Sequence, residues 1–374
     1  MTRASPRIAV LGGTGRVGRR ICARAAEAGI SVLIIARNEL RAAQLAADLN
    51  DQHPRARVDS AAADVHDRFA IERATATVDL LVVAAPVRDA LGDIAEACSA
   101  TACDCLDIVP AARIPDDLSN IAAVGARRGR LFVTQAGVVP GLPSALARAA
   151  ARRVDACASV RVGIALGVPA ASTPEDVYEL IDAAADYQPF VFDAGRWTRV
   201  SRRRFRTSMD FGPAFGPRVA VPIDLPELHG IERELDLKFV AAYGASAAWR
   251  VDVAGRTIIE TLYRVRRGLG RRTAAALLLA LARRSPATAA ASIVATAEGR
   301  RGGRPHCHTE RIDHADSAEL TARVVTAFLG RYFAGAYRAH AGLRCLGQLL
   351  DDAALDDVRN PNGLGLDPAV SRSA

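Results

Sequence analysis

The chain has 374 residues and a formal net charge of +8, and 50% of its residues are hydrophobic, 24% charged and only 5% aromatic. This composition is typical of a globular protein and excludes long disordered segments, and at roughly 150 residues per domain the length predicts two domains or three. No apolar run approaches the ~20 residues of a membrane-spanning helix, so we expect no membrane span.

Arginine supplies all of the basic charge except Lys238, the only lysine of the chain. A mechanism through a lysine Schiff base would therefore need Lys238 itself. The basic runs at residues 202–204, 264–272 and 300–304 lack interleaved aromatic residues, so we interpret them as solvated surface and expect no nucleic acid partner. Seven scattered cysteines, an odd number without a secretory signal, indicate reduced thiols and a cytoplasmic protein.

Short apolar runs alternate with helical patterns through the first part of the chain. The predicted strands comprise residues 8–11, 31–35, a short segment near 58, 79–84, 103–108 and 130–134. The predicted helices comprise residues 16–28, 39–49, 66–76 and 87–100. Because apolar strands that alternate with helices form parallel sheets covered on both faces, we predict an α/β fold with a doubly wound Rossmann sheet.

The pattern changes after Gly141. Apolar residues at 160, 162, 164 and 166 alternate with small or polar ones, which indicates a strand with one solvated face in an antiparallel or mixed sheet. The further predicted elements are helices at 172–185, 273–282 and 317–332 and a strand pair at 293–297 and 307–312. We expect a nucleotide-binding Rossmann domain over 1–135, an α+β substrate or dimerisation domain with a mixed sheet over 136–340, and a C-terminal segment, 341–374, that returns to the Rossmann domain.

A glycine motif joins the first predicted strand to the first predicted helix. Its residues are Gly12, Gly13, Thr14, Gly15, Arg16, Val17 and Gly18. In such a motif one glycine makes a tight turn, one lets a pyrophosphate approach the backbone, and one lets the helix pack closely on the strand. The helix N-terminus then offers N–H groups and a positive dipole end to the phosphates. This placement predicts dinucleotide binding; the alternative is a turn of the same shape without a ligand.

The end of the second predicted strand distinguishes between the two dinucleotides. About 20 residues after the glycine motif, an NAD site has an acidic residue for the ribose 2′-hydroxyl, whereas this chain has Arg37 and Asn38. Because a guanidinium suits a 2′-phosphate, we predict NADP(H) in preference to NAD(H). The alternative is a solvated Arg37, with Glu39 binding the ribose.

Two further segments are expected to contact the cofactor. Asp64 and Val65 follow the third strand, where Asp64 could accept a hydrogen bond from the adenine amino group. Ala84, Ala85 and Pro86 close the fourth strand and are expected beside the ribose and nicotinamide.

One class of enzyme is excluded by the lysine count. Short-chain dehydrogenases with this type of glycine motif use a Tyr-x-x-x-Lys pair. Since Lys238 is the only lysine, the tyrosine would have to occupy position 234, which holds Glu234.

With these residues identified, the chain resembles the saccharopine dehydrogenase-like family of NAD(P)-dependent oxidoreductases. The segments that carry the resemblance are residues 12–18, 84–86, 94–98, 105–107 and 135–142, with the helix from Thr321 and the glycine-rich tail. The resemblance implies a nucleotide domain joined to a mixed-sheet substrate domain, with hydride chemistry between the two. Related members act on imines formed from amines and carbonyl compounds.

The most distinctive shared segment is the loop at residues 135–142. The resemblance places Gly137, Pro140 and Gly141 of this loop against the nicotinamide. The family often has Asp-Pro-Gly here, whereas this chain has Val139 before Pro140 and continues without the polar residues suited to a dicarboxylate. Saccharopine itself is therefore not the expected substrate.

No residue pattern selects a single catalytic group. Asp107 ends a parallel strand at the edge where ligands bind, although a carboxylate there can also cap the strand end. Gln135 precedes the glycine loop and could contact the nicotinamide. Tyr187, His229 and Tyr243 are candidate proton donors.

Two clusters have metal-ligand chemistry, yet we predict no metal site. We interpret Cys98, Cys103 and Cys105 as structural thiols of the hydrophobic core. His306 and His308 share one face of a predicted strand, which could bind a metal or an anionic substrate but is more typical of a polar strand face.

The function predicted from the sequence is that of an NADP(H)-dependent oxidoreductase. It would transfer hydride to or from the carbon of a C=N (imine or amine) or C=O group in a small substrate. The alternative is a catalytically inert protein that senses the dinucleotide or binds a partner on the same fold. A homodimer paired through the second sheet is the expected assembly.

Overall fold

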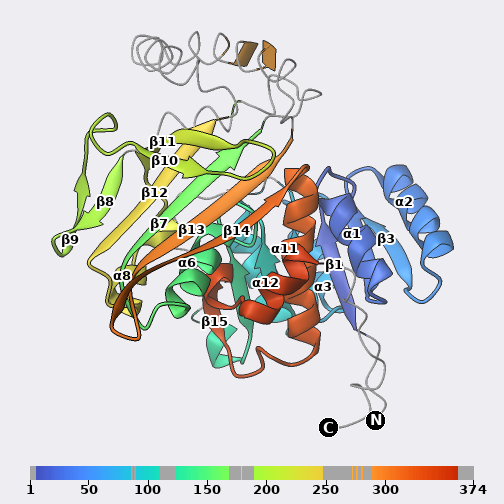
Figure 1. The fold of residues 1–374 in the computed structure, drawn as a ribbon. Helices are drawn as coiled ribbons and strands as arrows, with labels where there is room; N and C mark the ends of the chain where they lie inside the picture. The colour runs from blue at the N-terminus through green and yellow to red at the C-terminus, as the bar shows by residue number, and fades with distance from the viewer. Residues whose placement is uncertain are drawn as a thin grey trace. The chain divides into compact units, whose positions relative to one another are not determined.

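The computed structural model describes residues 6–85, 87, 90–109, 123, 125–167, 178, 189–246, 272, 275–276, 279–280 and 289–360 (Figure 1). Pro86, Tyr187 and most of the predicted helices at 172–185 and 273–282 lie outside these residues. Contacts divide the chain into two units. The first unit comprises Met1–Ala145 and Ala318–Ala374, and the second comprises Leu146–Ser317.

The first unit is built on a seven-stranded sheet in the order β15-β6-β5-β4-β1-β2-β3. Its strands are β1 (Arg7–Leu11), β2 (Ser31–Ala36), β3 (Val58–Ala62), β4 (Leu80–Val83), β5 (Asp104–Asp107), β6 (Leu131–Thr134) and β15 (Gly342–Cys345). Every neighbouring pair is parallel. In β1, an interior strand, Val10 pairs with Ile34 on one side and Val82 on the other, and all three are fully buried. The predicted doubly wound Rossmann sheet is confirmed.

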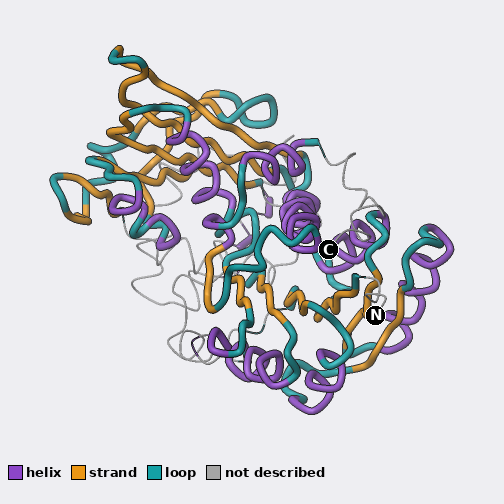
Figure 2. The backbone as a smooth tube through the Cα atoms, turned by 90° about the horizontal axis from the view of Figure 1, so that it is seen from below, coloured by secondary structure: helices purple, strands orange, loops and turns teal. Residues whose placement is uncertain are grey.

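Helices cover both faces of this sheet (Figure 2). They are α1 (Gly18–Glu27), α2 (Glu39–Gln52), α3 (Arg68–Thr75), α4 (Leu91–Ala100), α11 (Ser317–Phe333) and α12 (Asp352–Arg359). Because the strand order reverses after β3, right-handed crossovers place α1 and α2 on one face and α3 and α4 on the other. The α3 and α12 N-termini are capped by Asp67 and Asp351, whose side chains accept from Ala70 N and Ala354 N at 2.9 and 2.8 Å.

The late part of the chain completes the first unit. Glu319 of α11 pairs with Arg24 of α1, and β15 extends the sheet beside β6. The structure therefore assigns α11, and also the loop after β6, to the first unit, whereas the sequence analysis drew its boundaries at 135 and 340. The first contact joins positions about 300 residues apart and the second joins positions about 200 residues apart, which local sequence patterns do not encode.

The second unit contains an eight-stranded sheet in the order β10-β11-β12-β7-β13-β14, with β8 paired to β12 and to β9. Its strands are β7 (Ala156–Leu166), β8 (Phe190–Asp193), β9 (Arg196–Arg199), β10 (Thr207–Asp210), β11 (Pro217–Ile223), β12 (Phe239–Ser246), β13 (Ala291–Arg301) and β14 (Arg304–His314). Its short helices are η1 (Pro226–Leu228) and α8 (Ile231–Glu234). Among the described strands of this unit, β12 and β7 pair in parallel and the other pairs are antiparallel, so the predicted mixed sheet is confirmed.

The described helices also include α6 (Leu142–Arg152), whose residues belong partly to each unit, and η2 (Leu346–Gln348) in the first unit. Within the described part of the chain, no helix is both long and apolar enough to cross a lipid bilayer.

Candidate cofactor site

The carboxyl edge of the parallel sheet gathers most of the residues singled out in the sequence. The chain runs outward from β1 through β2 to β3 and then crosses to β4, so the strand order reverses between β1 and β4. Open α/β sheets bind their ligands outside the carboxyl ends of the strands at this reversal. The loops that follow these strands therefore form the candidate site.

The glycine turn after β1 is closed by short contacts that exclude side chains. Gly12 has a φ of 80°, and its N–H donates to Ile35 O at 2.9 Å. A Cβ at Gly12 would lie 2.8 Å from Ala84 O, and one at Gly18 would overlap the carbonyl oxygen of Gly12. The turn thus brings β1, β4 and α1 closer together than any residue with a side chain permits.

The N-terminus of α1 opens directly from this turn. The helix begins at Gly18, and Val17 at the N-cap position gives no side-chain hydrogen bond to the first turn. Gly15 and Arg16 are exposed, so the turn is accessible from solvent. Because the first N–H groups of a helix lack intrahelical partners and carry the positive end of its dipole, this turn fits a pyrophosphate.

Arg37 and Asn38 follow β2, the strand next to β1. Both are exposed, and no ion pair formed by the described residues involves Arg37. The Asn38 side chain accepts a hydrogen bond from Arg41 N at 3.0 Å and thereby caps α2. The structure gives Asn38 this capping role, and its predicted contact with the cofactor stays a prediction.

The residues predicted for the adenine and ribose lie at the ends of β3 and β4. Asp64 is exposed, and its Oδ1 accepts from His66 N at 3.0 Å, which leaves Oδ2 for a further donor. Val65, Ala84 and Ala85 are half-buried, and Ala84 N donates to Leu11 O at 2.8 Å. Each of these residues lies at the predicted edge of the sheet.

The loop after β6 is tightly folded. Gln135 has a left-handed φ of 58°, and Gly141, with a φ of 125°, approaches its carbonyl oxygen so closely that a Cβ would overlap it. Gly137 N donates to Pro140 O at 2.9 Å, and the Val139–Pro140 peptide bond is cis. The shared Ala-Gly-x-x-Pro-Gly segment therefore forms one compact turn at the carboxyl edge.

Buried polar side chains gather at the ends of β5 and β6. Asp107 is 3% exposed and accepts from the Thr134 hydroxyl and from Val109 N, the latter at 3.1 Å. Burial raises the pKa of the Asp107 carboxyl to about 7, although these two hydrogen bonds oppose the shift. Gln135 is also 3% exposed, and its Oε1 is buried without a hydrogen-bond partner among the described residues.

The remaining candidate proton donors that the structure describes lie in the second unit. His229 stacks on Trp197 with ring centroids 4.1 Å apart, and its Nε2 lies 2.7 Å from Asp224 Oδ1. Tyr243 is buried in β12, and burial raises the pKa of its hydroxyl. The sequence does not predict the stack of His229 on Trp197, because Trp197 lies in β9 and His229 follows η1, about 30 residues later.

The cysteine and histidine clusters have ordinary structural surroundings. Cys98, Cys103 and Cys105 are buried in the core of the first unit, where the neighbouring thiols and burial raise the pKa of Cys98 well above its usual value. In β14, His308 Nε2 lies 2.9 Å from Glu310 Oε1, and His306 is half-buried on the same face. Among the described residues, no group of three or more His, Cys, Asp and Glu side chains converges as metal ligands would.

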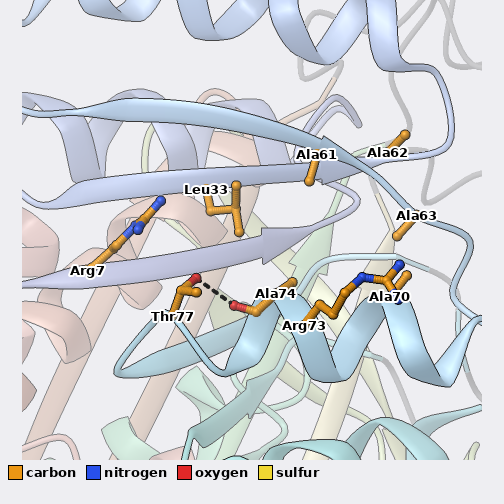
Figure 3. A pocket seen from close by; sticks show the side chains of 9 residues that line it. All are labelled: Arg7, Leu33, Ala61, Ala62, Ala63, Ala70, Arg73, Ala74 and Thr77. Carbon is orange, nitrogen blue, oxygen red and sulfur yellow. Dashed lines mark hydrogen bonds between the residues drawn. The ribbon is translucent and has the colours of Figure 1, made fainter.

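A hollow of about 270 Å³ lies elsewhere in the first unit, between β3 and α3 (Figure 3). It is lined by Arg7, Leu33, Ala61, Ala62, Ala63, Ala70, Arg73, Ala74 and Thr77. The facing alanines leave the space unfilled, and none of the predicted cofactor residues lines it.

Comparison with known proteins gives two kinds of match. The family model for short chain dehydrogenases matches residues 6–108, which contain the glycine turn and strands β1 to β5. No curated protein matches the chain. Among solved structures, the L-Glu-forming saccharopine dehydrogenase from Saccharomyces cerevisiae is similar with a TM-score of 0.68 and 14% identity, over 96% of this chain and 98% of that one.

Two other structures match more distantly. A mutant of meso-dapdh from Clostridium tetani with DAP has a TM-score of 0.48 and 12% identity, over 93% of this chain and 95% of that one. An engineered D-amino acid dehydrogenase bound to NADP+ has a TM-score of 0.48 and 14% identity, over 95% of this chain and 98% of that one.

The match to saccharopine dehydrogenase supports the fold. The chain shares the architecture of saccharopine dehydrogenase over nearly its whole length, so the resemblance stated from the sequence is confirmed at the level of the fold. The short chain dehydrogenase match ends at residue 108 and covers only nucleotide-binding elements. It is therefore compatible with the lack of a Tyr-x-x-x-Lys pair further along the chain.

Proposed function

We propose that this chain is an NADP(H)-dependent oxidoreductase that transfers hydride to or from the carbon of a C=N or C=O group in a small substrate. One observation carries the proposal. The glycine turn excludes side chains at the strand-order reversal, and an exposed arginine, Arg37, stands directly after the neighbouring strand. The match to short chain dehydrogenases over residues 6–108 supports the nucleotide-binding part.

The residues of the first unit would bind the cofactor in a defined order. The open first turn of α1 would hold the pyrophosphate, and the Arg37 guanidinium would donate paired hydrogen bonds to the 2′-phosphate. Asp64 would accept from the adenine amino group through its free carboxylate oxygen. The bound nicotinamide supplies the hydride chemistry, and the protein orients it and keeps water away.

We assign proton transfer to Asp107. A general acid or base works best when its pKa lies near the working pH, and burial raises the Asp107 pKa to about 7. The Thr134 hydroxyl donates to the carboxylate and holds its orientation. His229, Gln135 and Tyr187 are the other candidates from the sequence, and Asp107 differs from them in having a buried carboxyl group at the cofactor edge.

The preference for C=N over C=O rests on the shared architecture with saccharopine dehydrogenase. NADPH oxidation measured with a panel of amine–carbonyl pairs, and with the same carbonyl compounds alone, tests this preference. Turnover that requires the amine supports imine reduction, and equal turnover without it contradicts the preference. Tight cofactor binding with no turnover by any substrate favours the sensing protein instead. A homodimer and a cytoplasmic location stay predictions.

Paired titrations of NADPH and NADH test the cofactor assignment. We expect the wild type to bind NADPH more tightly and Arg37→Ala to lose that preference, since a charge-assisted pair contributes roughly 1.5–3 kcal/mol. Arg55→Ala is the matched control because Arg55 is also exposed but precedes β3 at the opposite edge of the sheet. Equal affinities in the wild type would move the ribose contact to Glu39, and no binding of either dinucleotide would refute the proposed function.

A further inference from the structure

We infer that the carboxamide oxygen of Gln135 is the hydrogen-bond acceptor that recognises the carboxamide N–H group of the nicotinamide. The inference rests on the proposed function, because it assigns a recognition residue within the proposed cofactor site. It draws on four features: an unpartnered buried oxygen, a constrained backbone, a position along the sheet edge, and the chemistry of the neighbouring groups.

The Oε1 atom of Gln135 is buried and has no hydrogen-bond partner among the residues that the structure describes. The residue as a whole is 3% exposed. Leaving a buried polar atom unpaired costs free energy, so nearly all such atoms in folded proteins have partners. A ligand that donates a hydrogen bond to Oε1 would recover this cost on binding.

The backbone of Gln135 is held in place by the loop that follows it. Its φ of 58° lies in the left-handed region, which residues other than glycine, asparagine and aspartate rarely adopt. The close approach of Gly141 to Gln135 O and the hydrogen bond from Ala136 N to Asp107 O, at 3.0 Å, fix this conformation. Strained, fixed residues of this kind are concentrated at ligand sites.

The position of Gln135 corresponds to the nicotinamide half of the cofactor. In the proposed site the glycine turn at the β1–β4 reversal would hold the pyrophosphate, and Arg37 and Asp64, which follow β2 and β3, would hold the adenosine half. The other half must therefore extend over β4, β5 and β6. Gln135 follows β6, two strand spacings of about 4.8 Å beyond β4.

The chemistry of the neighbouring groups favours an amide N–H as the partner. Oε1 can only accept hydrogen bonds, and a nicotinamide carboxamide presents two N–H donors. Two donors at this edge, the Thr134 hydroxyl and Val109 N, are engaged by Asp107. Among the described residues at the ends of β5 and β6, Gln135 Oε1 is a buried acceptor that lacks a hydrogen-bond partner.

The experiment compares the binding of two dinucleotides to three proteins. NADPH carries the carboxamide, and its reduced 3-acetylpyridine analogue replaces the NH₂ group with a methyl group that cannot donate. Dissociation constants are measured by calorimetry for the wild type, for Gln135→Met, which keeps the side-chain length without the acceptor, and for Gln135→Glu, which keeps an acceptor. The adenosine fragment 2′,5′-ADP, which has no nicotinamide, is titrated into each protein as the control for folding and for the rest of the site.

We expect the wild type to bind NADPH about tenfold more tightly than the analogue, the value of one hydrogen bond to a buried acceptor. Gln135→Met should bind both dinucleotides equally, Gln135→Glu should retain the preference, and all three proteins should bind 2′,5′-ADP alike. Two outcomes overturn the inference and leave the proposed function intact. One is that the wild type binds NADPH and its analogue equally, and the other is that Gln135→Met still prefers NADPH to the analogue. Wild type that binds neither dinucleotide nor 2′,5′-ADP overturns the proposed function and the inference with it.

Discussion

The buried carboxyl group of Asp107 predicts an unusual dependence of stability on pH. Its pKa rises from about 3.9 in the unfolded chain to about 7 in the native protein, mainly because burial disfavours the charged form. Between these two values the native state holds a proton that the unfolded chain has released. The stability contributed by this group is therefore complete below about pH 4 and falls as the pH rises to about 7.

The size of the effect follows from the shift. Each pKa unit corresponds to 1.36 kcal/mol, so ionised Asp107 costs the native state about 4 kcal/mol at pH 8 relative to pH 4. The Asp107→Asn variant cannot ionise and avoids this cost. The free energy of unfolding, measured with urea for both proteins across this range, should favour the variant progressively as the pH rises.

The comparison contains its own control. Asp51→Asn replaces an exposed carboxyl group near the end of α2 and should leave the difference from wild type nearly constant with pH. If the Asp107→Asn difference is equally constant, then the carboxyl group is solvated in the native protein. That result would also remove the reason for assigning proton transfer to Asp107.

Three further substitutions test the packing and the alternatives. Gly18→Ala places a Cβ against the Gly12 carbonyl oxygen, so it should destabilise the protein by roughly 1–3 kcal/mol in thermal melts and weaken NADPH binding at least tenfold in titrations. Gly299→Ala places a Cβ against the Ala156 carbonyl oxygen in the second unit and should cost a similar amount of stability with little change in cofactor affinity. His229→Phe keeps an aromatic ring stacked on Trp197 and should retain near-wild-type turnover; a loss of about 10²-fold or more would move proton transfer from Asp107 to His229.

The sheet of the first unit was predictable because its signals are local. The apolar run that ends at Leu11 and the glycines that follow it specify a buried strand and a side-chain-free turn within one short segment. The left-handed backbone of Gln135 was not predictable, since it depends on the approach of Gly141 within a folded loop. The pairing of β15 with β6 joins segments about 200 residues apart, and no local pattern in either segment predicts the strand with which it pairs.

Polar residues were the harder part of the site for a related reason. Asn38 was predicted to bind the cofactor from its place after β2, but the same residue type is also among the best helix caps, and the structure shows that role. Asp107 was predicted as either a site residue or a strand-end cap, and its carboxylate does accept from Val109 N as such a cap would. The burial of Asp107 and its contact with Thr134 support its assignment as a general acid. Both depend on the pairing of β5 with β6 in the folded sheet.

The order of residues along the sheet edge gives a final test of the cofactor assignment. From β3 to β6 the edge presents Asp64, Arg37, the glycine turn, Asp107 and Gln135, which matches the order of adenine, 2′-phosphate, pyrophosphate and nicotinamide along the dinucleotide. Arg37 and Gln135 follow strands four spacings apart, about 19 Å, and share no partner. The effects of substitutions that far apart on binding free energy are additive to within about 0.5 kcal/mol. The fold-loss of NADPH affinity in the Arg37→Ala, Gln135→Met double variant should therefore equal the product of the fold-losses in the two single variants. A marked departure from additivity would mean that the two residues contact the same part of the ligand, and the extended placement of the cofactor along this edge would then be wrong.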